Sequence, residues 1–194
     1  MKILFVHGFS EKPFAADKSI TQMKEYLRKE GFEVDVIDYS EGEPTYANLG
    51  LYSKRVAEEI RKEPYFAIIA HSMGGPITNS AIQMTSTKTR IVIFLESPNL
   101  GVPLWLIPIA RILGIHLKTN LPSVKDLMTG SYFLQKIELN RKISYHQIGG
   151  LYSALFPKVF IDSHIPTLLF PTTTHSGLKR NPKVLRQIAK ILKN

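Results

Sequence analysis

The feature that most constrains the fold is an apolar run that ends in a turn carrying a single serine. Residues 65–70 form a short apolar run that is rich in β-branched side chains, which predicts a buried strand. Residues 76–84 carry a helical pattern. Between them lies the turn Ala70-His71-Ser72-Met73-Gly74-Gly75. A strand, a tight turn and an immediate helix are typical of a nucleophile elbow, which lifts the serine oxygen above the sheet edge. The pattern therefore predicts that Ser72 is a nucleophile, the alternative being an ordinary turn.

Strands and helices alternate along the chain. The first half predicts strands over 3–6, 32–37, 65–70 and 90–95 and helices over 20–29, 49–62 and 76–84. The less regular second half predicts strands over 143–148 and 167–170 and a helix over 181–192. Alternation of this kind indicates a parallel sheet with helices on both faces. At 194 residues the chain fits one domain. We therefore expect a single compact α/β domain over 1–194 with about six mainly parallel strands.

A serine hydroxyl needs a base, usually a histidine that a carboxylate holds in one tautomer. His7, Ser72 and Glu96 each follow a predicted strand, so the carboxyl ends of parallel strands would bring them to one sheet edge. His175 follows the last strand and precedes the last helix, which predicts the same edge. We therefore expect His175 to be the base. The backbone N–H groups of Met73 and of Phe9, in the loop after the first strand, are the expected oxyanion donors.

Four short segments carry a resemblance to a known family. They are Val6-His7-Gly8-Phe9, Ala70-His71-Ser72-Met73-Gly74-Gly75, Ser97-Pro98-Asn99-Leu100-Gly101 and Thr174-His175-Ser176-Gly177-Leu178. With them, the chain resembles the α/β-hydrolases, and among these the small lipases; alanine in place of the first elbow glycine occurs in one group of small bacterial lipases. The resemblance implies a compact α/β-hydrolase fold. It also implies hydrolysis of carboxylic esters through acylation and deacylation, with no metal and no organic cofactor.

The carboxylate that would orient His175 is missing from the position where the family pattern places it. The family usually places it just after the strand before last, and Ser153 stands at that position here. Glu96, at the end of the strand that follows the nucleophile strand, is one substitute. Asp162, in a segment that resembles the usual local pattern around the acid, is another, although it lies only thirteen residues before His175. The sequence leaves Glu96, Asp162 and the absence of any carboxylate open.

An apolar segment that resembles a lid or cap covers about 102–135. Residues 102–117 are its most apolar part, and two alternatives fit them: a buried helix over the sheet, or a groove wall for an acyl chain. In the second alternative the lining side chains are Trp105, Leu106, Ile109 and Leu113. The expected substrate is then a small acyl ester or a lipid. An acyl thioesterase with the same site and a non-catalytic binding protein on a hydrolase scaffold remain as rival functions.

The charge and the cysteine content restrict the kinds of site and partner that the protein can have. The chain has no cysteine, which excludes disulfides, thiolate metal sites and cysteine nucleophiles. The formal net charge is +9, but no nucleic-acid-binding motif accompanies it, so a solvated basic surface is favoured over a nucleic-acid partner. The last helix carries a basic stripe that could attract an anionic lipid surface weakly: Lys179, Lys183, Arg186, Lys190 and Lys193. The N-terminal apolar run is too short for a signal peptide, so a cytoplasmic location is expected.

Overall fold

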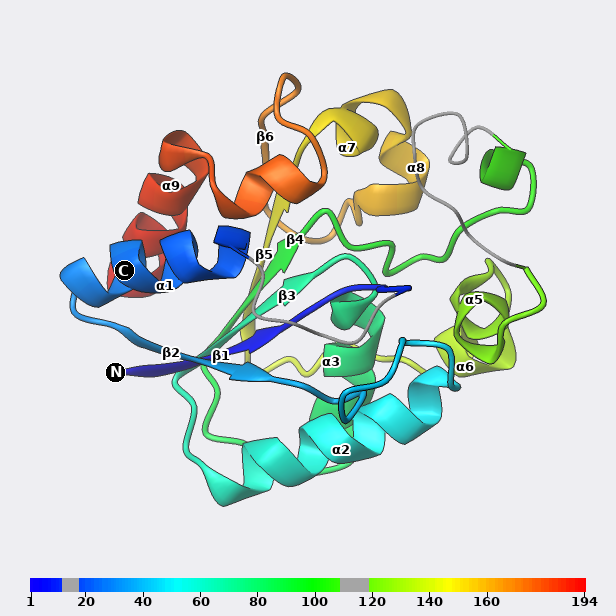
Figure 1. Ribbon diagram of the computed structural model, residues 1–194, viewed down its shortest axis with the longest axis horizontal. Helices are drawn as coiled ribbons and strands as arrows, with labels where there is room; N and C mark the ends of the chain where they lie inside the picture. The colour runs from blue at the N-terminus through cyan, green and yellow to red at the C-terminus, as the bar shows by residue number, and fades with distance from the viewer. Residues whose placement is uncertain (12–17, 109–118) are drawn as a thin grey trace.

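A computed structural model describes residues 1–11, 18–108 and 119–194 of the chain, with all their side chains except those of residues 18 and 19. Six strands form one sheet in the order β2-β1-β3-β4-β5-β6, and every neighbouring pair is parallel (Figure 1). Their bounds are β1 Lys2–Val6, β2 Glu33–Ile37, β3 Ala67–His71, β4 Ile91–Leu95, β5 Ser144–Gly149 and β6 Thr167–Leu169. The expected α/β fold class is therefore confirmed.

Helices cover both faces of the sheet, because successive residues of the central strands are buried on opposite sides. Ile3 and Phe5 pack in a core with α1 (Lys18–Lys29) and α9 (Pro182–Lys193). Leu4 and Val6 pack in a second core with α2 (Leu49–Lys62) and α3 (Gly74–Gln83). Figure 1 shows α1 and α9 together on one side of the sheet and α2 and α3 on the other.

The second half of the chain contains short helices that the sequence did not predict. They are α5 Pro122–Leu127, α6 Tyr132–Gln135, α7 Leu151–Leu155, α8 Pro157–Phe160 and the 3-10 helix η1 Ser176–Lys179. Each is too short to show a repeated helical pattern of apolar residues. Two of them, α7 and η1, flank the candidate site.

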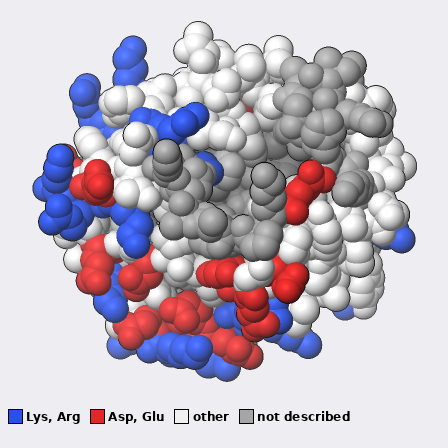
Figure 2. Space-filling view, viewed as in Figure 1, with Lys and Arg blue, Asp and Glu red and all other residues white. Residues whose placement is uncertain are grey.

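Figure 2 shows how charge is distributed over the face seen in Figure 1. Basic and acidic side chains mix along the lower margin, over α2, whereas basic side chains dominate the left margin, over α1 and α9. Within the described ranges, no helix is both long enough and apolar enough to cross a membrane.

Candidate active site

The turn after β3 holds Ser72 in a backbone conformation that L-residues rarely adopt. Its φ is +55°, in the left-handed region, and non-glycine residues there are uncommon and strained. The N–H of Ser72 still donates to the carbonyl of Leu95 at the end of β4, at 3.0 Å. The chain therefore leaves the sheet abruptly at Ser72 and enters α3 two residues later, at Gly74. This is the strand–turn–helix geometry that the sequence predicts for the elbow.

Glycines let three backbone segments meet around Ser72. A Cβ on Gly8 would lie 2.6 Å from the Cβ of Ser72, so the loop after β1 abuts the serine directly. A Cβ on Gly74 would lie 2.4 Å from the carbonyl oxygen of Val6, which shows how closely α3 begins against β1. Phe9 follows Gly8 and Met73 follows Ser72, so the two expected oxyanion donors belong to segments on either side of the serine. Their role as donors stays a prediction.

The structure brings His175 and Glu96 together. Nδ1 of His175 donates a hydrogen bond to Oε2 of Glu96 at 2.9 Å. The Glu96 side chain is 0% exposed and that of His175 is 17% exposed. A carboxylate in this position fixes the imidazole tautomer and leaves Nε2 available to accept a proton. Of the two carboxylates that the sequence left open, Glu96 is the one in contact with His175.

The Glu96 carboxylate is held by the N-terminal end of α7. The N–H groups of Gly150 and Ser153 donate to its Oε1 at 2.9 and 2.8 Å. These two hydrogen bonds use N–H groups that are free at the start of the helix, and they fix the position of the carboxylate. A Cβ on Gly150 would lie 3.2 Å from Oε2, so glycine leaves room for the acid. Glu96, whose φ of +46° turns it out of the end of β4, thus reaches the neighbourhood of Ser153, where the family pattern places the acid.

Asp162 lies elsewhere and makes different contacts. Its Oδ1 accepts from the N–H of His164 at 2.9 Å, and its own N–H donates to Oε1 of Gln147 at 3.1 Å. It therefore stabilises the turn that precedes β6, at the amino end of that strand. His175 follows the carboxyl end of the same strand, which explains why a carboxylate only thirteen residues upstream does not meet it.

His71 links the elbow to the loop that carries the base. Nε2 of His71 donates to the carbonyl oxygen of His175 at 3.1 Å, and the two rings lie 4.5 Å apart at their centroids. Burial lowers the pKa of His71 well below the usual value, so the ring is neutral at pH 7. This contact places the His175 loop next to the residue that precedes Ser72.

Aromatic side chains from α7 and α8 lie beside the base. The ring of Tyr152 is 5.4 Å from that of His175 and 6.3 Å from that of Phe160. The ring of Phe156 meets Trp105 edge-on at 6.4 Å. The sequence reasoning missed Tyr152, Phe156 and Phe160; their spacing of four suggests one helical face, but Phe156, with φ −130° and ψ 61°, separates α7 from α8.

The four side chains expected to line an acyl groove have different surroundings. Trp105 is 61% exposed, whereas Leu106 is 3% exposed and packs in the core. Ile109 and Leu113 lie outside the described residues. The bridge between Val102 and Met128 ties the start of this segment to the chain after α5.

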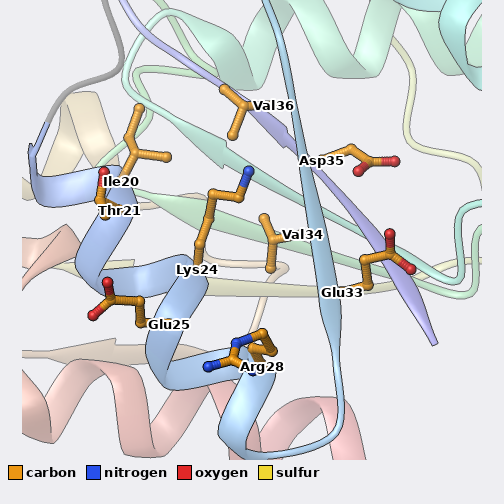
Figure 3. Close-up of a pocket in the computed structure, with 9 residues that line it drawn as sticks. All are labelled: Ile20, Thr21, Lys24, Glu25, Arg28, Glu33, Val34, Asp35 and Val36. Carbon is orange, nitrogen blue, oxygen red and sulfur yellow. The ribbon is translucent and has the colours of Figure 1, made fainter.

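A cavity of about 620 Å³ lies away from these residues, between α1 and β2 (Figure 3). Lys24 of α1 and Val34 and Val36 of β2 lie between the helix and the strand, whereas Glu33 and Asp35 extend from the opposite side of β2. Because the cavity is on the strand at the far edge of the sheet, it is separate from the Ser72 site. Among the described residues, no group of three or more His, Asp or Glu side chains is arranged to hold a metal ion.

The sheet order, the elbow after β3 and the histidine after the last strand together define the α/β-hydrolase fold, which this chain has. No family model and no curated protein matches the sequence. Solved structures do match. The mature lipase BlEst2 of Bacillus licheniformis is similar with a TM-score of 0.75 and 17% identity, over 98% of this chain and 91% of that one.

Two further structures widen the range of activities among the similar proteins. A lipase-esterase related protein from Clostridium acetobutylicum ATCC 824 has a TM-score of 0.61 and 19% identity, over 100% of this chain and 93% of that one. The Vlm2 thioesterase domain has a TM-score of 0.63 and 15% identity, over 98% and 90%. At these identities the likeness establishes the fold.

Proposed function

We propose that the protein is a serine hydrolase that cleaves carboxylic esters through an acyl-enzyme on Ser72. The observation that carries the proposal is the 2.9 Å hydrogen bond from His175 to the fully buried Glu96, at the sheet edge where Ser72 is held with a φ of +55°. A base fixed by a buried carboxylate, in a loop that contacts the residue preceding a strained serine, is an arrangement for nucleophilic catalysis. The α/β-hydrolase fold and its lipase and esterase neighbours support the same class.

In the proposed reaction, Oγ of Ser72 attacks the ester carbonyl carbon while Nε2 of His175 takes the hydroxyl proton. The N–H groups of Phe9 and Met73 stabilise the negative charge on the carbonyl oxygen. Glu96 stabilises the positive charge on the imidazolium. The intermediate then collapses, the alcohol leaves with the proton from His175, and an acyl group remains on Ser72. A water molecule, deprotonated by His175, releases the acid by the reverse sequence.

The surroundings of His175 favour a substrate with an apolar acyl chain. The ring of Tyr152 lies beside that of His175, and Trp105, which is 61% exposed, meets the ring of Phe156. Leu104 and Leu155, which are 70% and 52% exposed, neighbour Trp105 and Phe156 in the chain. An exposed group of apolar side chains beside a site is typical of a surface that binds an apolar ligand.

Labelling with a fluorophosphonate tests the nucleophile. Wild-type protein is expected to be labelled covalently, and Ser72→Ala is expected not to be. Ser176→Ala is the matched control, because Ser176 is exposed and directly follows the base; it should be labelled. Folded wild-type protein that fails to label would refute the enzyme proposal and favour a binding protein on a hydrolase scaffold.

An acyl thioesterase is the second candidate, favoured by the likeness to the Vlm2 thioesterase domain. The same residues would act on an acyl thioester, with a thiol as the leaving group. Nitrophenyl esters and acyl thioesters with matched acyl chains of 2 to about 12 carbons distinguish the two. A higher kcat/KM for the oxygen esters at every chain length supports the esterase, and the opposite order supports the thioesterase.

A further inference from the structure

The net charge of the chain is concentrated in one layer of the fold. Residues 18–30 and 179–194 contain ten Lys and Arg and two Glu, which leaves eight of the nine net positive charges in these two segments. They form α1, η1 and α9, the helices on one face of the sheet. By contrast, residues 49–63, around α2 on the other face, contain four basic and three acidic residues. Basic residues that are distributed along the sequence are thus collected on one side by the fold.

Eight of the ten basic side chains of this layer are exposed on its outer side. Ile20, Met23 and Leu27 of α1 and Val184 and Ile188 of α9 are buried against it. The opposite faces of the two helices, with the turn before α9, carry eight exposed cations: Lys24, Arg28, Lys29, Arg180, Lys183, Arg186, Lys190 and Lys193. We call this set the α1–α9 basic face; Figure 2 shows basic side chains gathered at the margin where these helices lie.

Acidic side chains neutralise little of the α1–α9 basic face. Lys193 pairs with Glu30 at 2.5 Å. In the part of the chain that the structure describes, Lys183, Arg186 and Lys190 have no carboxylate within 4.0 Å. Several cations held together without counter-charges create a positive potential, which attracts an anionic surface at a distance of about one Debye length, roughly 10 Å at 0.1 M salt.

We infer that the α1–α9 basic face docks the protein on an anionic phospholipid bilayer. The outer faces of α1, η1 and α9 carry no exposed aromatic side chain among the described residues, so they lack the stacking surface that single-stranded nucleic acids use. Exposed leucines of β6, Leu168 and Leu169, precede the basic helix in the chain, and His175 lies between them and α9. The preference for lipid over other polyanions rests on the proposed function, because an ester with an apolar acyl chain resides in a bilayer.

Sedimentation with vesicles tests the docking. Wild-type protein is expected to bind vesicles of phosphatidylglycerol mixed with phosphatidylcholine, to release at 0.5 M salt, and not to bind pure phosphatidylcholine. The variant Lys183→Glu/Arg186→Glu/Lys190→Glu should bind about 100-fold or more weakly, since each basic residue near an anionic membrane contributes roughly fivefold. The same variant should hydrolyse a soluble ester at the wild-type rate, which also shows that it is folded.

The matched control reverses three charges on the opposite layer. Lys54, Arg61 and Lys62 of α2 are exposed, so Lys54→Glu/Arg61→Glu/Lys62→Glu changes the net charge equally. It should retain vesicle binding within about threefold. Equal loss in both variants, absence of wild-type binding to anionic vesicles, or tighter binding of a short DNA duplex at the same salt would each overturn the inference. Vesicle binding by a protein that hydrolyses no ester would support the docking and refute only the proposed function.

Discussion

Replacement of Glu96 by Gln is the sharpest test of the candidate triad. The carboxylate uses both oxygens: Oε2 accepts from Nδ1 of His175 at 2.9 Å, and Oε1 accepts from the N–H groups of Gly150 and Ser153. A glutamine of the same shape must put its NH₂ on one side or the other. Neither orientation preserves all three hydrogen bonds, because each side of the carboxylate faces donors.

The two orientations have calculable costs. With the NH₂ towards His175, the ring must carry its proton on Nε2, and this tautomer cannot accept the serine proton. With the NH₂ towards Gly150 and Ser153, buried donors face each other, which costs about 1–3 kcal/mol for each unsatisfied group. In both, the imidazolium loses its counter-charge. We expect kcat to fall by about 10³ to 10⁴, equivalent to roughly 4–5.5 kcal/mol in the transition state, with little change in KM.

Hydrolysis of a soluble nitrophenyl ester, with kcat and KM measured separately, provides the assay. Asp162→Asn is the matched control: it also replaces a carboxylate by an amide, but its side chain contacts the His164 N–H and not His175. It should keep kcat within about twofold. If Glu96→Gln retains more than a tenth of the wild-type kcat, or if both variants lose activity equally, the assignment of Glu96 as the residue that orients His175 is wrong.

Three other predictions follow from the same contacts. Gly8→Ala should lower kcat by about 10²-fold or more and destabilise the protein by about 1–3 kcal/mol, because its Cβ would lie 2.6 Å from that of Ser72; urea unfolding and ester turnover measure both effects. His71→Phe keeps a ring but removes the donor to the His175 carbonyl, so we expect about tenfold lower kcat and an unfolding free energy reduced by about 1–3 kcal/mol; unchanged kinetics would contradict this role. Burial lowers the pKa of His7 from 6.5 to about 4, so below pH 6.5 the unfolded chain takes up a proton that the folded protein does not. His7 should therefore lower the unfolding free energy by up to roughly 3 kcal/mol between pH 6.5 and pH 4, in addition to the fall that the buried His71 contributes, and His7→Phe should remove the His7 part in urea titrations across this range.

The sequence by itself predicted the framework of the fold and named two members of the candidate site. The strands and long helices have strong periodic patterns, because each must bury one or both faces. Helix 49–62, for example, is confirmed with the bounds Leu49–Lys62 and with Asn48 as its cap. Ser72 and His175 were recognisable because the residues beside each one indicate the backbone conformation of its segment.

The tertiary structure decided what depends on contacts between distant residues. Glu96 and Asp162 are both carboxylates near predicted strand ends, and no local pattern distinguishes them. Their difference arises because β4 and β5 are neighbours in the sheet, so that Glu96 reaches the N–H groups of Gly150 and Ser153. In the same way, basic residues separated by 150 positions along the chain became one surface only when α1 and α9 packed on the same face. This packing decides which carboxylate contacts His175 and where the basic surface lies. The sequence directly encodes only the short-range geometry of strand, turn and helix.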